Sequence, residues 1–138
     1  FKNKKVYLKV PSSPHQQFYI LIVLQMLMNN IDDWIYSIRK SKKLIVVEGN
    51  KDKKALNSFG IHNVITIKKP LFEVVENISN ITDECILLLD LDKEGRKIYS
   101  YLKRNLERVG VKIDSKYREF LFKNTELTNI EGLKKYCL

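Results

Sequence analysis

The chain has 138 residues, of which 44% are hydrophobic and 30% are charged. These values are typical of one globular domain and argue against intrinsic disorder. Lysine and arginine together number 25 and aspartate and glutamate 16, which gives a formal net charge of +9 at pH 7. This basic excess favours a polyanionic partner, with nucleic acid first, although basic surfaces also occur without one.

Cysteine content and apolar runs exclude further classes. The two cysteines form no disulfide framework, and with the two histidines they form no zinc-site spacing. The apolar run at 18–28 is interrupted by Gln25 and is too short to span a membrane as a helix. We therefore expect a cytoplasmic protein with reduced thiols and no membrane element.

Residues 1–27 differ from the rest of the chain. They show no clear hydrophobic periodicity, contain two prolines and begin with a lysine-rich stretch. We interpret 1–27 as an N-terminal extension or upstream translation rather than part of the shared fold. The folded domain is then expected over 28–138.

From Asn30 the hydrophobic pattern becomes regular. Apolar residues in NNIDDWIYSIRKS recur at i, i+3, i+4 and i+7, which predicts an amphipathic helix capped by Asn30 or Asp32. The apolar run 43–47 then predicts a buried strand. The stretch KDKKALNSFG predicts a short helix with Asp52 near its start.

The alternation of strands and helices continues along the chain. A second strand is predicted at 63–67, followed by a helix with Pro70 in its first turn, where a missing N–H costs least. A third strand at 85–89 leads into a long helix, and a short fourth strand at 111–113 precedes a last helix in SKYREFLF. The apolar stripe of the long helix is expected to consist of Ile98, Leu102, Leu106 and Val109.

Continuously apolar strands that alternate with helices are typical of a parallel sheet covered on both faces. We therefore predict an α/β fold with a central parallel sheet of about four strands and helices on both faces. Ligands of such sheets bind at the carboxyl ends of the strands. Glu48 follows the first strand, and Asp90 and Asp92 end the third, so all three are expected at one edge.

Three acidic residues, Asp90, Asp92 and Glu94, lie within five positions after the third apolar run. Carboxylates this close repel one another, so a folded protein tolerates them mainly where solvent or a cation lies nearby. The residues alone leave two interpretations open. One is a strand that ends in a solvated acidic turn, and the other is a site for a divalent metal ion.

The two motifs VVEGNKD and LLLDLDKEG, each at the end of an apolar strand, together resemble the TOPRIM domain. This is the catalytic module of topoisomerases, primases and several nucleases, and it has a Rossmann-like fold. The resemblance covers roughly 43–113. The chain is most similar to small archaeal stand-alone members, which are similar to the bacterial nucleases that mature 5S ribosomal RNA. The stretches WIYSIRKSKKLIVVEG, KPLFEVVE and NIEGL carry this further likeness.

The resemblance implies a role for each position that matches the motifs. Glu48 matches the family's general acid or base, which moves a proton at the bridging oxygen of a phosphodiester. Asp90 and Asp92 match its magnesium ligands, and Glu94 takes the place of a third acid found in some members. The expected cofactor is Mg²⁺, with Mn²⁺ as an alternative, and hard oxygen ligands suit it.

Three residues beside the motifs are expected to support the site. Gly49 and Gly95 would allow tight turns and close approach of the backbone to a phosphate. Asp52 would support the metal site from outside the ligand set or stabilise the start of its helix, and the two roles are equally plausible. Glu94 is likewise explained by the dipole of its helix.

Four basic residues are expected to hold substrate phosphates. Arg96 would do so through a fork of hydrogen bonds, and Lys51, Lys68 and Lys69 as point charges. All four follow predicted strands, which places them near the same edge of the sheet. A solvated surface is the alternative for Lys51.

The sequence therefore predicts magnesium-dependent cleavage of phosphodiester bonds in nucleic acid, with RNA favoured over DNA, as a step of RNA processing. The alternative is a non-catalytic TOPRIM module that binds RNA or a ribonucleoprotein. Metal-dependent binding that survives Glu48→Gln, without any cleavage, would favour the alternative.

Overall fold

The computed structural model describes residues 14–16 and 30–136. The predicted extension at 1–27 lies outside these residues except for 14–16, so its status stays a prediction. The described chain contains helices α2 (Ile31–Ser41), α3 (Asn50–Asn57), α4 (Leu71–Ile81), α5 (Lys93–Arg108) and α6 (Lys116–Asn124), strands β1 (Leu44–Val47), β2 (Val64–Thr66), β3 (Glu84–Leu87) and β4 (Lys112–Ile113), and the 3₁₀ helix η1 (Glu131–Tyr136).

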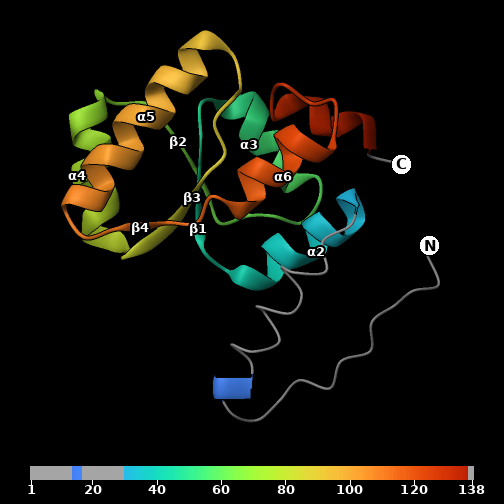
Figure 1. The fold of residues 1–138 in the computed structure, drawn as a ribbon, viewed down its shortest axis with the longest axis horizontal. Coiled ribbons are helices and arrows are strands. Elements are labelled where there is room, and N and C mark those ends of the chain that lie inside the picture. The colour runs from blue at the N-terminus through green and yellow to red at the C-terminus, as the bar shows by residue number, and fades with distance from the viewer. Residues whose placement is uncertain (1–13, 17–29, 137–138) are drawn as a thin grey trace.

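The four strands form one parallel sheet in the order β2-β1-β3-β4 (Figure 1). β1 and β3 are the two central strands, and Val46 lies opposite Leu87 in their register. This confirms the predicted α/β fold with a parallel sheet of four strands. Because β1 and β3 are neighbours and run in the same direction, the segments that follow them leave the sheet side by side.

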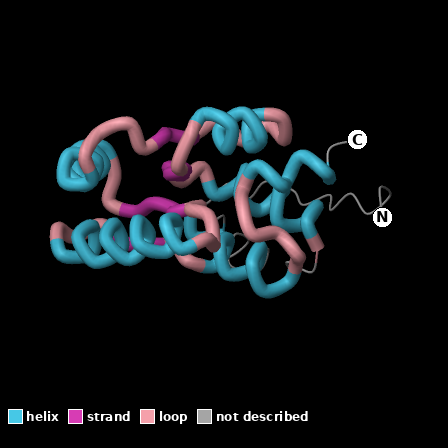
Figure 2. The backbone as a smooth tube through the Cα atoms, turned by 90° about the horizontal axis from the view of Figure 1, so that it is seen from above, coloured by secondary structure: helices cyan, strands magenta, loops and turns pink. Residues whose placement is uncertain are grey.

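Helices cover both faces of the sheet, with α4 and α5 on one face and α2, α3, α6 and η1 on the other (Figures 1 and 2). Alternate side chains of each strand enter the two cores, as strand geometry requires. In β1, Ile45 and Val47 pack toward α2 and α6, whereas Leu44 and Val46 pack toward α4 and α5. The sheet is therefore buried on both sides, as the apolar runs predicted.

Trp34 connects α2 to α6 across the first core. Its side chain is fully buried, and its Nε1 donates a hydrogen bond to the carbonyl oxygen of Tyr117 at 2.9 Å. The two rings meet edge to face, with centroids 6.2 Å apart. Through this contact α6, which follows β4, is fixed against α2 and the sheet.

The helix ends match the sequence prediction only in part. Pro70, predicted in the first turn of its helix, is the N-cap of α4 instead, and α3 ends at Asn57, before Gly60. Asn30 caps α2 as predicted, because its Oδ1 accepts a hydrogen bond from the Asp33 N–H at 3.0 Å. The prediction that Val109 belongs to the apolar stripe of α5 is wrong, since Val109 is 54% exposed. The chain leaves α5 at this point through Gly110, whose φ is +91°, and Val111 enters the core instead.

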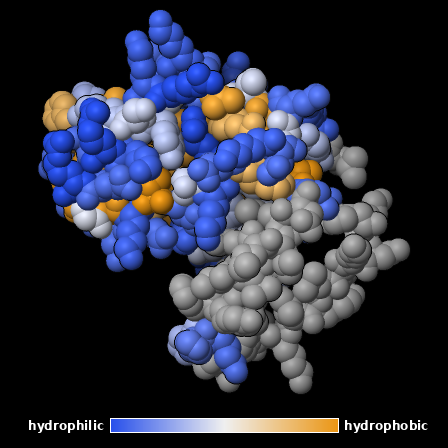
Figure 3. Space-filling view, viewed as in Figure 1, coloured by the Kyte–Doolittle hydropathy of each residue, from blue (hydrophilic) through white to orange (hydrophobic). Residues whose placement is uncertain are grey.

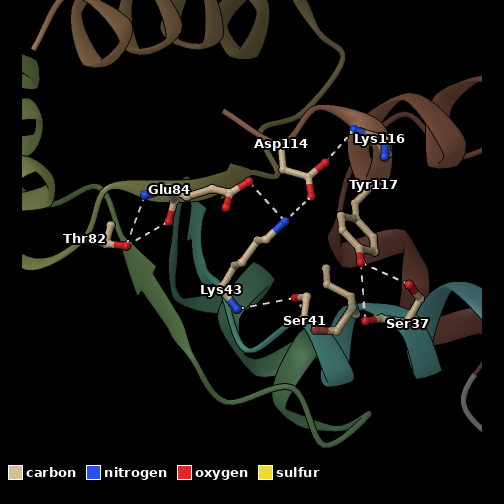
Figure 4. A network of polar contacts seen from close by, with 9 residues as sticks. Ser37, Ser41, Lys43, Thr82, Glu84, Asp114, Lys116 and Tyr117 are labelled. Atoms are coloured by element: carbon tan, nitrogen blue, oxygen red, sulfur yellow. Dashed lines mark hydrogen bonds and ion pairs between the residues drawn. The ribbon is translucent and has the colours of Figure 1, made fainter. Parts of the chain in front are cut away.

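Lys43 lies before β1 and bridges two acidic residues (Figure 4). Its Nζ is 2.7 Å from Asp114 Oδ2 and 3.1 Å from Glu84 Oε2. We call these three residues the Lys43 cluster. Burial lowers the pKa of Lys43, but the hydrogen bonds and charges of Asp114 and Glu84 outweigh burial and raise it overall. The cluster ties the start of β1 to β3 and to the segment after β4.

In the described part of the chain, the helices are too short or too polar to cross a membrane.

Candidate active site at the carboxyl edge of the sheet

Glu48 and Asp90 lie together at the carboxyl ends of β1 and β3. Glu48 follows the last residue of β1, and Asp90 comes soon after β3. The backbone N–H of Asp90 donates a hydrogen bond to Glu48 Oε2 at 3.0 Å, although the two residues are 42 positions apart. The parallel pairing of β1 with β3 thus brings the two motifs into direct contact.

Asp92 caps α5 beside this pair. Its Oδ1 accepts a hydrogen bond from the Gly95 N–H at 2.7 Å, which satisfies a free donor of the first helical turn. The charge of Asp92 is close enough to raise the pKa of Glu48. The structure therefore gathers Glu48, Asp90 and Asp92 into one acidic cluster, which we call the Glu48 cluster.

Gly95 allows α5 to start directly against the end of β3. A Cβ atom at position 95 would lie 2.2 Å from the carbonyl oxygen of Asp90 and 3.0 Å from Asp92 Oδ1. Real Cβ atoms essentially never come that close to backbone, so only glycine fits here. Gly49 is different, because its φ of −146° suits any residue and nothing lies within 4 Å of its Cβ position.

A segment near the end of the described chain holds Asp90 from the other side. The Ile130 N–H donates to Asp90 Oδ1 at 3.0 Å, and the Leu91 N–H donates to the Thr128 carbonyl oxygen at 2.8 Å. Each carboxylate of the Glu48 cluster thus has one oxygen fixed by a backbone N–H. The sequence does not reveal this role of residues 128–130, because the likeness of NIEGL to the family does not show which backbone groups contact Asp90.

Arg118 of α6 supports the same turn and was also missed. Its Nε donates to the carbonyl oxygen of Leu89 at 3.0 Å, and its Nη2 donates to that of Asp90 at 3.3 Å. The guanidinium lies over the rings of Tyr99 and Phe122, at 4.1 and 5.2 Å from their centroids. Burial lowers the pKa of Arg118, while the charges of Tyr99, Asp90 and Glu48 act against that shift. In the sequence, the only sign of this role is that Phe122 follows Arg118 by one helical turn.

The Glu48 carboxyl group has a pKa raised to about 7. Burial is the largest cause, and the side chains of Asp90 and Asp92 add to it through their charges. The hydrogen bond from the Asp90 N–H works in the opposite direction. Near neutral pH, Glu48 therefore exists in both its protonated and its ionised form.

Asp52 lies in the first turn of α3 and is only 8% exposed. Its Oδ2 accepts a hydrogen bond from the Gly49 N–H at 3.1 Å, so it stabilises the turn that carries Glu48 into the helix. Burial raises the pKa of Asp52, and the charges of Asp90 and Glu131 raise it further. Both roles considered for Asp52 are thus compatible with its position.

The remaining predicted site residues are exposed. Lys51 lies in the first turn of α3, Lys68 and Lys69 lie between β2 and α4, and Glu94 and Arg96 lie in the first turn of α5. All five therefore follow carboxyl ends of strands, as predicted. Of these, Arg96 is close enough to Arg118 for its charge to lower the pKa of that residue.

The donor set of the Glu48 cluster fits a magnesium ion. Within residues 14–16 and 30–136, no three His, Cys, Asp or Glu side chains form a group that could hold a metal ion by themselves. Magnesium needs no such group, because it keeps several waters and takes one or two carboxylates together with substrate phosphate. Asp90 and Asp92 each have one oxygen fixed by a backbone N–H, and the other could serve as a ligand.

The chain belongs to the Toprim domain family, which matches residues 43–120. It is 29% identical to a UPF0292 protein of Methanocaldococcus jannaschii over 104 residues, which cover 72% of this chain and 81% of that protein. It is 31% identical to a UPF0292 protein of Pyrococcus abyssi over 102 residues, covering 72% and 76%. A solved structure of a protein from Aquifex aeolicus is similar, with 36% identity and a TM-score of 0.70, over 75% of this chain and 98% of that one. The predicted resemblance is confirmed, and membership of the family indicates a metal-dependent function related to nucleic acid.

Proposed function

We propose that this protein is a magnesium-dependent phosphodiesterase that cleaves nucleic acid, with RNA as the preferred substrate. One observation carries the proposal: a carboxyl group with a pKa of about 7, Glu48, lies against Asp90 and beside Asp92 at the carboxyl edge of a Toprim sheet. An acid–base catalyst works best when its pKa is near the operating pH. A solvated acidic turn without chemistry gives no reason to place Glu48, half-buried, beside two further acids.

The residues divide the chemical work as follows. Glu48 Oε2 is held by the Asp90 N–H, so the other carboxyl oxygen can hold a proton and pass it to the bridging oxygen of the scissile bond. Asp90 and Asp92 would hold Mg²⁺, with Mn²⁺ as the alternative. When bound, such an ion neutralises charge on the phosphoryl group and orients the attacking group. Glu94 would act on this site through water rather than as a direct ligand.

Basic residues around the carboxylates offset the repulsion between acids and phosphate. Arg118 points its charge toward Glu48 and Asp90 while it holds two backbone carbonyls. Lys51, Lys68, Lys69 and Arg96 form an exposed rim on the segments that follow β1, β2 and β3. We propose that this rim holds the substrate phosphates on either side of the scissile bond.

The test is cleavage of labelled structured RNA by purified protein, with Mg²⁺ and with chelator. We expect Glu48→Gln to reduce the rate by about 10²- to 10⁴-fold, the usual contribution of acid–base catalysis, and Asp90→Asn to abolish the response to Mg²⁺. Glu76→Gln and Asp83→Asn remove exposed carboxylates elsewhere in the chain and serve as matched controls. Both controls should cleave at the wild-type rate.

A second readout does not depend on activity. Mg²⁺ should raise the thermal midpoint of the wild type by mass action, and Asp90→Asn should lose most of that rise. Folded wild-type protein that binds RNA in the presence of Mg²⁺ but cleaves neither RNA nor DNA would contradict the proposal. It would favour a non-catalytic module that binds RNA or a ribonucleoprotein.

A further inference from the structure

A shallow groove with basic walls lies along the outer side of α5. Its lining includes Leu91, Lys93, Arg96, Lys97, Tyr101 and Arg104. Leu91 and Lys93 are the two sequence neighbours of Asp92, so one end of the groove lies close to this residue of the Glu48 cluster. From there the groove follows α5 away from the end of β3. We call it the α5 groove.

The α5 groove carries four cations and no acid. Lys93, Lys97 and Arg104 recur at helical spacing on one side of α5, and Arg96 lies next to them. In the described chain, none of these four forms an ion pair, whereas Lys103 on the same helix pairs with Glu107 at 3.0 Å. The four cations of the groove therefore have no ion-pair partner within the described residues.

A solvated face of an amphipathic helix is the simpler explanation for charges on α5. Such a face usually mixes both signs, and Lys103 with Glu107 shows that pattern further along the same helix. The α5 groove differs because it has charge of one sign and also an apolar and aromatic wall from Leu91 and Tyr101. Figure 3 shows hydrophilic side chains along the length of α5. Cations combined with an aromatic ring are the combination that single-stranded nucleic acid requires.

We propose that the α5 groove binds the phosphodiester backbone of a single nucleic-acid strand and leads that strand to the Glu48 cluster. The inference rests on the proposed function for the site to which the strand leads. From Lys93 to Arg104 the helix rises by about 16 Å, so its cations are far enough apart to contact more than one phosphate of a strand that runs along it. Tyr101, which is half-buried, can offer the exposed part of its ring to one base.

The experiment measures binding without cleavage. Fluorescence anisotropy in EDTA follows wild-type protein with a single-stranded oligoribonucleotide, and with an oligodeoxyribonucleotide of the same sequence, over a series of salt concentrations. Each phosphate contact contributes about 0.7 to the slope of log K against log salt for a single strand. We expect Lys97→Ala and Arg104→Ala each to reduce the slope by about 0.7, and the double variant by about 1.4.

Two lysines provide matched controls. Lys103 lies on α5 but is paired with Glu107, and Lys112 is exposed in β4, whose start lies at the opposite end of the sheet. Lys103→Ala and Lys112→Ala should leave the slope nearly unchanged. Since the positions compared are on the surface, thermal midpoints should be similar and will show whether every variant is folded.

The outcomes separate the groove from the proposed function. Wild-type slopes in the double variant, or no binding by the wild type, would overturn the groove. If the wild-type protein nevertheless cleaves RNA with Mg²⁺, the proposed function stands without the α5 groove. A reduced slope in a protein that never cleaves would support the groove and count against the proposed function. Equal effects on both oligonucleotides would show that the groove reads phosphate alone, and a larger effect with RNA would show that it also contacts ribose.

Discussion

The Lys43 cluster and the Glu48 cluster lie at opposite ends of β1, and they differ in whether their acidic side chains are paired with a cation. At the start of β1, Lys43 lies within ion-pair distance of both Asp114 and Glu84. At the end of β1, Glu48 and Asp90 lie together, and one oxygen of each carboxylate accepts a hydrogen bond from a backbone N–H. The acids of the Lys43 cluster are paired with a cation, whereas Glu48, Asp90 and Asp92 form no ion pair within the described residues.

The nearby arginine makes this difference sharper. Arg118 could pair with the acids of the Glu48 cluster, but its Nε and Nη2 donate to the carbonyls of Leu89 and Asp90 instead. The acids consequently stay available to an ion or a proton, and the pKa of Glu48 rises to about 7. A folded protein accepts such local repulsion mainly at functional sites. The comparison therefore separates a cluster that stabilises the fold from one that is prepared for chemistry.

The largest effect is expected at Gly95, where the Glu48 cluster depends on backbone packing. Gly95→Ala places a methyl group against the Asp90 carbonyl, so α5 must move, which should reduce the free energy of unfolding by about 3 kcal/mol. Gly49→Ala is the control, since its Cβ position is open and its φ is ordinary. Chemical denaturation measures both. Equal stability of the two variants would show that the start of α5 is not fixed against β3.

A smaller loss is expected in the Lys43 cluster, where the effect should be on stability alone. Lys43→Met leaves the Asp114 side chain, which is 7% exposed, without its cation, and should cost about 2 kcal/mol. Lys103→Met breaks an exposed pair on α5 and should cost no more than about 0.5 kcal/mol. Under conditions where Lys43→Met is folded, its cleavage rate should equal that of the wild type. A lower rate would show that the two ends of β1 are coupled.

Arg118→Lys tests whether the turn at Asp90 needs a planar, two-donor group. Lysine keeps the charge but cannot reach both carbonyls in one plane or lie flat over Tyr99, so about 1 kcal/mol of stability should be lost. Because Asp90 is displaced, the Mg²⁺ concentration needed for half-maximal activity should rise more than the maximal rate falls. A drop in rate without any change in the Mg²⁺ requirement would indicate direct contact with substrate.

Sequence patterns could predict the fold because its strands are buried on both sides. Runs such as KLIVV and CILLL are apolar at every position or nearly so. Short runs of this kind are typical of strands in a parallel sheet that is covered on both faces. Because Glu48 and Asp90 follow neighbouring parallel strands, the predicted sheet also placed them at one edge. The pattern failed at Val109, since a stripe of apolar residues does not show where a helix ends when the turn depends on Gly110.

The contacts that sequence patterns could not predict are those made by single residues across the fold. Arg118 and Ile130 reach Asp90 from 28 and 40 positions away, and both act on the backbone or through it. Backbone donors and acceptors are the same in every residue, so no residue type marks Ile130 as a partner of Asp90. Arg118 lies one turn before Phe122, but aromatic neighbours of an arginine are common on helices. Long-range contacts of this kind require the folded structure.

A pH dependence of stability distinguishes the two clusters most directly. The pKa of Glu48 is raised from 4.5 to about 7 in the folded protein, so between these values the folded state binds more protons than the unfolded state. Stability due to this group is therefore fully present below pH 4.5 and is lost as the pH rises through about 7. Glu48→Gln remains neutral throughout, so without metal it should be more stable than the wild type above pH 7, with the difference shrinking toward pH 4.5. Thermal midpoints of both proteins in EDTA measure the difference, in which the shared contribution of Asp52 cancels. Parallel curves would mean that Glu48 titrates normally and that the acids of this cluster are already compensated, as they are around Lys43.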